Sequence, residues 1–284
     1  MDNERPNETM NRPSANQPGA GRSSAVEAAA VEAAAVGSAA VGSAAVRGDG
    51  SGQLAKTDRS RVRRQPVRAS YDRKTAYGIL DAGLVAQVAF CVDGRPFVIP
   101  MVYGRSGDLL YLHGAAVSRI LKTLAGGVEI SLGVTHVDGL VLARSAFHHS
   151  VNYRSVVFFG TAFEVTDHQE KLVALDAVVE HVVPGRSPHV RGPSEKEVAI
   201  TKVLALRLDE GSVKCRVGPP VDDEEDYKLP VWAGVVPLAA TPGTPLVDDR
   251  VAPGIEIPSC VTEYKRPGQD DVDQDGPVGG LGVT

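Results

Sequence analysis

The sequence predicts a mainly antiparallel β-barrel with attached helices, a fold of the α+β class. The expected strands follow one another through short turns, and the clear helices come late in the chain. Strand and helix do not alternate, so a Rossmann or TIM-barrel architecture is disfavoured. The apolar block Val156–Phe159 is typical of a strand covered on both faces, which indicates that part of the barrel is buried against a second copy of the chain.

Length, charge and cysteine content set limits on function. The chain has 284 residues, of which 43% are hydrophobic and 23% charged, so it can bury a substantial core. Its 30 basic and 35 acidic residues give a net charge of −5, which excludes a globally basic nucleic-acid-binding protein. Three widely spaced cysteines form neither a disulfide framework nor a zinc-finger spacing, and they favour a reducing cytoplasm.

Composition divides the chain into three expected segments. Residues 1–66 read as a disordered, low-complexity N-terminal arm with a five-residue Ala-rich repeat, a period that forms no helical seam. Residues 67–238 read as the folded domain, and residues 239–284, rich in Pro, Gly and Asp, as a flexible tail. Acidic residues interrupt the only apolar stretch of the arm, so neither a signal peptide nor a membrane span is expected.

Local sequence signals define the elements of the domain. Asp-Gly pairs favour tight hairpin turns, Gly83 and Pro184-Gly185 end helices, and Asp167 can cap one. We therefore expect a helix over 75–82, strands over 84–92 and 96–103 joined at Asp93-Gly94, a strand over 109–113, a helix over 117–124, strands over 128–137 and 140–144 joined at Asp138-Gly139, a strand over 156–165, helices over 167–183 and 194–201, and strands over 203–208 and 213–217.

A basic run lies at the start of the domain and consists of Arg59, Arg61, Arg63, Arg64, Arg68, Arg73 and Lys74. Two interpretations stay open. It can be an anion-binding arm for phosphate or nucleic acid. It can also be a solvated linker that docks on the protein's own acidic surface, for which the cluster Asp222–Asp226 is available.

The first polar candidate site runs from Tyr111 to Lys122. A strand ends at His113, and Ser118 and Arg119 stand at the start of a helix, where free backbone N–H groups favour anions. A hydroxyl and a guanidinium at that place predict a phosphate site, to which Lys122 adds charge. The alternative is an ordinary helix cap with surface cations.

The second candidate segment, Ser145–Gly160, carries the polar residues His148, His149, Asn152, Tyr153, Arg154 and Ser155. Adjacent histidines on an extended chain point to opposite faces, and the segment contains no carboxylate, so no metal site is expected. A loop that lines a ligand and plain structural hydrogen bonding remain the two alternatives.

Several segments resemble the pyridoxamine 5′-phosphate oxidase-like flavin-binding family, within it the flavin-nucleotide-binding or nitroimidazole-resistance-like branch. They are DGRPFVIPMVYG, LLYLHGAAVSR, DGLVLARSAFHHSVNYRSVVFFG, EHVVPGR and VWAGVVPL, spread over about 67–238. The resemblance implies a split β-barrel, a homodimer and FMN bound at the dimer interface.

The resemblance also implies roles for particular residues. Pro100 and Met101, with Tyr103 in the same strand, would lie along the flavin ring, and His113 would lie near it. The other cofactor-binding residues would be Ser118, Arg119 and Lys122 at the phosphate, Tyr153, Arg154 and Ser155 close to the site, and Trp232 over the ring. The substrate-phosphate signature of the oxidase proper is not found near the C-terminus.

The leading hypothesis is therefore a cytoplasmic, homodimeric FMN-dependent oxidoreductase that acts on an unidentified small molecule, with His113 as the candidate catalytic residue. One alternative is a non-catalytic flavin-binding or sensor protein. Another is a split barrel that uses haem or deazaflavin in place of FMN, with His148 and His149 as the iron ligands if haem is bound. Neither a membrane nor a nucleic acid is expected as a partner.

Overall fold

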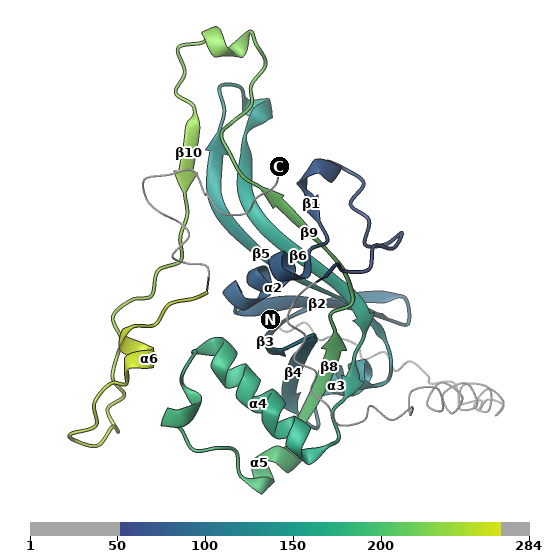
Figure 1. Cartoon of the computed structure of the whole chain (residues 1–284), viewed down its shortest axis with the longest axis vertical. Helices are drawn as coiled ribbons and strands as arrows, with labels where there is room; N and C mark the ends of the chain where they lie inside the picture. Colours follow the sequence, from purple (N-terminus) through teal and green to yellow (C-terminus); the bar gives the residue numbers. More distant parts are fainter. Residues whose placement is uncertain (1–51, 268–284) are drawn as a thin grey trace, which may run out of the picture. The chain divides into compact units, whose positions relative to one another are not determined.

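A computed structural model describes residues 52–267, and an antiparallel sheet organises this part of the chain (Figure 1). Its strands pair in the order β1-β9-β6-β5-β2-β3-β4-β8-β7, and β10 is added to β5. The strands are β1 (Ala69–Ser70), β2 (Val85–Val92), β3 (Arg95–Ser106), β4 (Leu109–Ala115), β5 (Glu129–Leu142), β6 (Ser150–Thr161), β7 (Phe163–Glu164), β8 (Thr201–Arg207), β9 (Glu210–Arg216) and β10 (Gly234–Pro237).

Short helices connect and cover these strands. The α-helices are α2 (Arg73–Ala82), α3 (Arg119–Ala125), α4 (His168–Val182), α5 (Glu195–Ile200) and α6 (Ser259–Thr262), and the 3-10 turns are η1 (Pro66–Arg68), η2 (Ala146–His148), η3 (Ser187–His189) and η4 (Asp226–Lys228). The predicted antiparallel β fold with a few helices is thus confirmed. Among residues 52–267, no helix has the length and apolar character needed to cross a membrane.

The turn and capping residues in the sequence correctly predicted one hairpin and the starts of two helices. Asp93 and Gly94 have φ values of 50° and 73°, the left-handed backbone that a tight two-residue hairpin turn needs. Asp167 caps α4, because its carboxylate accepts a hydrogen bond from the Glu170 N–H at 2.8 Å. Ser194 and Glu197 form a capping box at the start of α5.

The predicted hairpin at Asp138-Gly139 is wrong. The strand β5 runs through both residues with a bulge in its pairing to β6, and the chain turns back only at η2. Neither residue has the positive φ of a tight turn. The Asp138 carboxylate instead accepts two hydrogen bonds from the Arg154 guanidinium, at 3.0 and 2.9 Å, and Gly139 pairs with Pro237 of β10.

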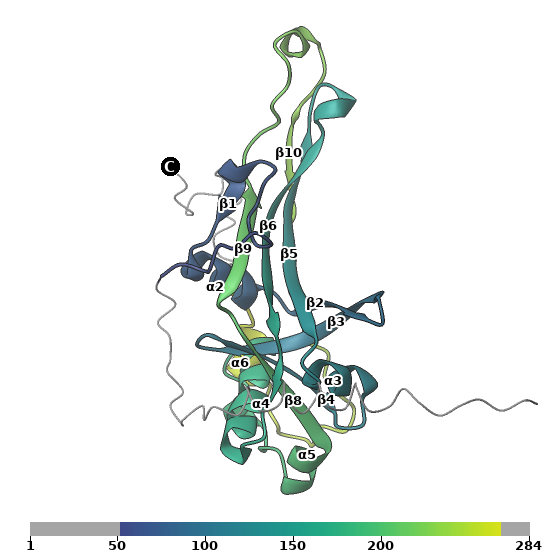
Figure 2. The same cartoon turned by 90° about the vertical axis from the view of Figure 1, so that its right-hand side faces the viewer.

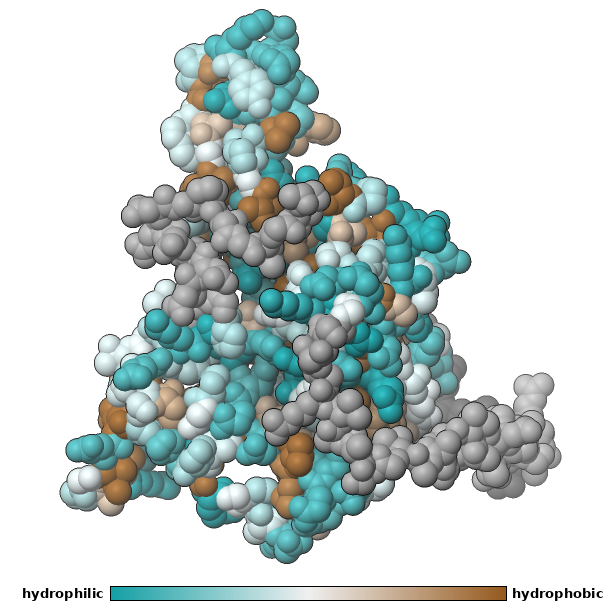
Figure 3. All heavy atoms as spheres, in the orientation of Figure 1, coloured by the Kyte–Doolittle hydropathy of each residue, from teal (hydrophilic) through white to brown (hydrophobic). Residues whose placement is uncertain are grey.

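The continuation of β5 and β6 beyond this bulge makes a protrusion, which we call the arm and define as residues 138–152 and 217–237. Figures 1 and 2 show β5, β6 and β10 running together along it, with η2 and η4 near its far end. The sequence analysis did not include β10, a strand of 4 residues. Figure 3 shows hydrophobic patches among the hydrophilic atoms of the arm.

The packed part of the chain begins earlier than residue 67. Leu54 is buried in the main core, and the guanidinium of Arg59 pairs with Glu210 at 2.6 Å and with Glu129 at 2.9 Å. The start of the basic run therefore docks on acidic groups of the protein itself, though on these two glutamates and not on the cluster Asp222–Asp226. Residues 1–51, with the Ala-rich repeat, lie outside the described residues.

The C-terminal segment is also anchored as far as it is described. The guanidinium of Arg266 donates to the backbone carbonyls of Asp81 and Gly83, both at 2.6 Å, and the Tyr264 hydroxyl donates to Val182 O at 3.1 Å. These carbonyls stand at the ends of α2 and α4, where a helix leaves acceptors unsatisfied. Residues 239–267 are thus tied to the domain near their end, and residues 268–284 lie outside the described part.

The helix α4 packs against β3 at a point where only glycine fits. A Cβ on Gly104 would lie 2.6 Å from the Val178 amide nitrogen and 2.7 Å from the Ala177 carbonyl carbon. Both atoms belong to the helix backbone, which cannot move aside as a flexible side chain can. This close approach fixes how α4 lies on the sheet.

We predict that Gly104→Ala destabilises the protein by about 1–3 kcal/mol, because the added methyl group pushes α4 off β3. Gly78→Ala is the matched control: it lies within α2 and a Cβ there meets nothing within 4 Å. That variant should gain about 0.5–1 kcal/mol through helix propensity. Urea unfolding followed by circular dichroism measures both. Equal stability of Gly104→Ala and the wild type would contradict the packing described here.

Candidate functional site

The first group of candidate residues lies where β4 leads into α3. His113 is on β4, and its Nδ1 is buried without a hydrogen-bond partner among the described residues. Burial lowers the pKa of this imidazole, which favours the neutral form. A buried polar atom is normally hydrogen-bonded, so the unused nitrogen fits a bound group that supplies the missing partner.

The start of α3 offers an anion three kinds of donor. Ser118 is the N-cap residue, but its side chain makes no capping hydrogen bond. Arg119 and Lys122 are exposed, and neither forms an ion pair with a described residue. The helix begins two residues later than the expected 117, yet Ser118 and Arg119 stand at its start as the sequence predicts. The Ser118 side chain thus does not act as a helix cap, and the phosphate site stays a prediction.

The residues expected along the flavin ring differ in exposure. Pro100 points outward from β3, and Met101 is half-buried against the core. Tyr103 is fully buried: its hydroxyl donates to Leu80 O at 2.6 Å and its ring lies 4.3 Å from that of His181. The Tyr103 side chain therefore belongs to the core, and the expectation that it contacts a cofactor needs correction. Side chains alternate along a strand, which explains the difference between neighbours.

The second group lies on β6 and the arm. Arg154 is held by Asp138, and the Ser155 hydroxyl donates to Lys214 O at 2.9 Å, so these residues stabilise the sheet. Tyr153 is paired in register with Arg216 of β9. Trp232 is exposed on the segment before β10. In the order of the sheet, β5, β2 and β3 lie between β6 and β4.

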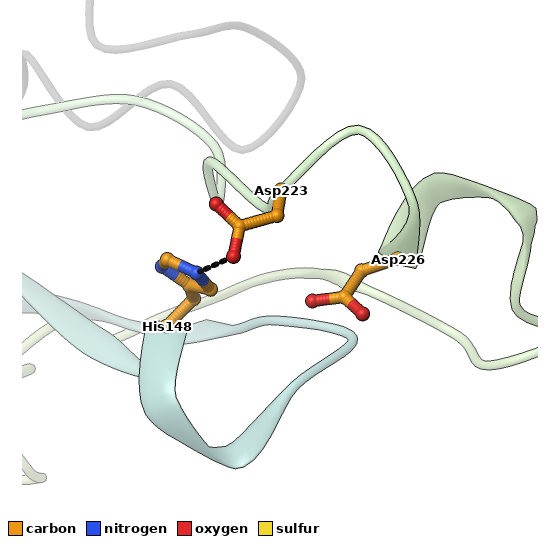
Figure 4. A group of neighbouring side chains, drawn as sticks. All are labelled: His148, Asp223 and Asp226. Atoms are coloured by element: carbon orange, nitrogen blue, oxygen red, sulfur yellow. Dashed lines mark hydrogen bonds and ion pairs between the residues drawn. The ribbon is translucent and has the colours of Figure 1, made fainter.

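A side-chain cluster that the sequence analysis missed lies near the far end of the arm (Figure 4). His148 Nε2 lies 3.3 Å from the Asp223 carboxylate, and Asp226 places its own carboxylate beside them, all three ligand atoms being within 4.8 Å of one another. The two aspartates come from a distant segment of the chain, so the sequence of residues 145–160 alone does not indicate the cluster. Asp223 is 81% exposed, so this is a surface contact of small energy.

The two adjacent histidines do not lie on an extended strand, contrary to the sequence analysis. His148 ends the 3-10 turn η2, and His149 follows it. The Nδ1 atom of His149 is 2.9 Å from the Ser145 carbonyl oxygen. Because the chain turns here, both imidazoles face the same cavity and not opposite sides of a sheet.

A half-buried polar cluster lies against β3, around His181 of α4. The ring of His181 donates from Nε2 to the Gly83 carbonyl at 2.7 Å and stacks on Tyr103. Burial, together with the positive charge of Arg266, lowers the pKa of His181 to about 4. The ion pair between Arg105 and Asp81 completes this cluster, which joins α2, β3, α4 and the C-terminal segment. Its groups are bonded to one another, so the cluster is structural.

Comparison with known proteins identifies the family. The sequence profile described as pyridoxamine 5′-phosphate oxidase matches residues 72–215. The flavocytochrome Anf3 from Azotobacter vinelandii is 38% identical; the match covers 74% of this chain and 98% of that one, with a TM-score of 0.70. An FAD and haem binding protein from Mycobacterium smegmatis is also 38% identical over 70% of this chain and 98% of that one, with a TM-score of 0.67.

A putative 5-nitroimidazole antibiotic resistance protein from Bacteroides thetaiotaomicron is 22% identical over 51% of this chain and 86% of its own, with a TM-score of 0.42. Among curated proteins no match is found. The chain belongs to the pyridoxamine 5′-phosphate oxidase family, as the sequence motifs predicted.

We predict that the stability of the protein falls as the pH drops from about 6.5 to about 4, because unfolded His181 takes up a proton at its ordinary pKa while the folded one resists until pH 4. The loss from this residue should reach at most about 3 kcal/mol and should not grow below pH 4.

The variant His181→Gln keeps an N–H donor for the Gly83 carbonyl and should show a flatter dependence of unfolding free energy on pH. The exposed His189→Gln is the control and should keep the wild-type slope. Urea unfolding at pH 7, 5.5 and 4.5 measures both. Identical slopes for the two variants would show that His181 does not carry this dependence.

Proposed function

We propose that this protein is an oxidoreductase that binds a flavin and a haem. The observation that supports the proposal most is the 38% identity over nearly the whole length of a flavocytochrome and of an FAD and haem binding protein. The sequence motifs led us to expect FMN. The second of these relatives is described as binding FAD, so we propose FAD as the flavin.

The residues where β4 meets α3 fit a flavin phosphate. The free hydroxyl of Ser118 and the unpaired charges of Arg119 and Lys122 are the donors that a phosphate requires. The unused Nδ1 of neutral His113 can hydrogen-bond to the bound group or to a substrate beside it. When bound, a flavin supplies hydride and electron transfer, and these residues bind and orient it.

We propose that two copies of the chain pair through the outer face of β2 and β3. Val98 is 61% exposed there, and Val85 and Val102 are exposed beside it, an apolar set that water disfavours. In such a pair, the β6 and arm residues of one copy would lie toward the start of α3 of the other. Sedimentation of the purified protein as a monomer at micromolar concentration would contradict this pairing.

The spectrum of the purified protein tests the proposed cofactors. We expect absorption bands of oxidised flavin together with a Soret band, and denaturation should release FAD that chromatography distinguishes from FMN. A reduced nicotinamide nucleotide or dithionite added without oxygen should bleach the flavin bands. A colourless protein that takes up neither FAD nor hemin would contradict the proposal. Bound cofactors that only dithionite reduces would point to a cofactor-carrying or sensor protein.

We predict that Arg119→Ala weakens flavin binding by roughly 2–3 kcal/mol, because it removes a charge-assisted contact to a phosphate. The exposed Arg250→Ala removes the same charge far along the chain and should leave the affinity within about twofold. Fluorescence titration of the apoprotein with FAD gives both constants. Unchanged affinity in Arg119→Ala would remove this residue from the phosphate site.

A further inference from the structure

An open cavity of about 420 Å³ lies between the arm, β9 and the segment that precedes β1. Its lining brings together side chains from residues 64–68, 147–150, 214–216 and 221–223, which are far apart in the sequence. The volume lies in the range of small-molecule sites, roughly 300–1,000 Å³. Ten of the twelve lining residues are polar or charged, so the cavity suits a hydrophilic solute and not an apolar ring.

Four cationic side chains from two segments line the cavity: Arg64, Arg68, Lys214 and Arg216. Lys214 and Arg216 are two positions apart on β9, so their side chains lie on the same face of the strand. Arg68 directly precedes β1, which pairs with β9 through Ala69 and Lys214. The pairing of the strands therefore holds these cations close together.

The cations of the cavity lack a counter-charge. None of the four forms an ion pair within residues 52–267. Arg216 is only 9% exposed, and its guanidinium donates to neutral oxygens alone, those of Asn152, Gly218 and Pro219. Burial and the positive charge of Arg68 both lower the pKa of Arg216, because each disfavours the charged guanidinium. An anion in the cavity would stabilise this arrangement.

The two aspartates that line the cavity have other partners. Asp222 accepts hydrogen bonds from the backbone N–H and the guanidinium of Arg144, at 2.9 and 3.0 Å, and its side chain is fully buried. Asp223 lies against His148 (Figure 4). Neither carboxylate is bonded to one of the four cations, so the cavity keeps an excess of positive charge.

A compact dianion matches this charge pattern better than a long polyanion. Asp223 lines the cavity and is exposed, and the exposed Glu224 and Glu225 follow it in the chain. These carboxylates would repel a nucleic acid that extended past the cavity. A phosphate monoester carries a charge of about −1.5 to −2 at neutral pH, and guanidinium groups bind it through paired hydrogen bonds.

His149 offers an acceptor to the rest of such a ligand. The Ser145 carbonyl can only accept, so the 2.9 Å contact requires that Nδ1 of His149 carries the proton. The lone pair of Nε2 can then accept a hydrogen bond from a hydroxyl group. Gln65 and Ser150 also line the cavity, and their side chains both donate and accept. A phosphorylated molecule with free hydroxyl groups would use both the cations and these polar side chains.

We propose that this cavity binds a small phosphate ester of a hydroxyl-bearing molecule. The phosphate lies against Arg68, Lys214 and Arg216, and a hydroxyl donates to Nε2 of His149. This solute is separate from the flavin and the haem of the proposed function. Arg64 and Arg68 belong to the basic run, so part of that run acts as an anion-binding element, one of the two interpretations that its sequence left open.

The phosphate site is tested by calorimetric titration of the full-length protein with inorganic phosphate and with glucose 6-phosphate, at constant ionic strength. The variant Arg68→Gln/Lys214→Gln should weaken the binding of both probes at least about tenfold. Arg61→Gln/Arg63→Gln removes two charges outside the cavity lining and should change both affinities by less than about twofold. Equal losses in the two variants, or no binding of either probe at millimolar concentration, would overturn the proposal.

Thermal unfolding gives a second test that does not depend on tight binding. In chloride alone, Arg68→Gln should raise the melting temperature, because it removes the charge that faces Arg216. In the wild type, phosphate should raise the melting temperature above its value in chloride of the same ionic strength, whereas Arg68→Gln/Lys214→Gln should lose this response. A lower melting temperature for Arg68→Gln in chloride would show that Arg68 is already compensated and would contradict the proposal.

The polar body of the ligand is tested by the difference between the two probes. Glucose 6-phosphate should bind the wild type at least about tenfold more tightly than inorganic phosphate, because its hydroxyl groups add hydrogen bonds. His149→Ala should remove most of this preference and leave phosphate binding unchanged. The exposed His189→Ala lies outside the cavity lining and should keep the preference. Equal affinity of the wild type for the two probes would overturn the assignment of a hydroxyl-bearing ligand.

FAD also contains phosphate groups, so titrations with and without FAD separate the two sources. We expect glucose 6-phosphate to bind FAD-loaded and FAD-free protein equally well, and Arg68→Gln/Lys214→Gln to keep the wild-type affinity for FAD. Competition between FAD and glucose 6-phosphate would assign the cavity to the phosphates of the flavin and would overturn the proposal. A protein that binds the ester but takes up neither FAD nor hemin would support this inference and contradict the proposed function alone.

Discussion

The strand β5 is the constraint on which the rest of the structure depends. It spans 14 residues and pairs with three others: β2 on one side, β6 on the other, and β10 farther along. Its first half forms the barrel wall and its second half the arm. The bulge at Asp138, held by Arg154, marks the change from one to the other. Because a bulge bends a strand, this point decides where the arm leaves the sheet.

The contrast between the two Asp-Gly pairs shows which part of the fold the sequence could predict. Asp93-Gly94 makes a turn because the strands on both sides pair with each other immediately. Asp138-Gly139 has the same local signal, yet Gly139 pairs with Asn152 of β6 and Pro237 of β10. The Asp138 carboxylate is bound by the Arg154 guanidinium. Local turn propensity is a weak preference, and long-range pairing overrides it.

The candidate sites divide in the same way. Ser118 and Arg119 stand at a helix start that three or four consecutive residues define, so the sequence could place them. The contacts of His148 with Asp223, and of Asn152 with Arg216, join residues 75 and 64 positions apart. No local periodicity reports such contacts, because they follow from the path of the arm. The burial of Tyr103 was missed for a related reason: the side of β3 that meets α4 depends on Gly104, one position further on.

Charge distribution connects these observations to function. The chain is acidic overall, with a net charge of −5, and several of its arginines have a carboxylate partner, as Arg59, Arg105 and Arg144 do. Other cations have no ion pair among residues 52–267, and two of them, Arg119 and Lys122, stand together at the start of α3. The chain has more acidic than basic residues, so carboxylates are available to pair with its cations. A buried cation without such a partner is destabilising. The positive charge at the start of α3 is what the proposed flavin phosphate requires.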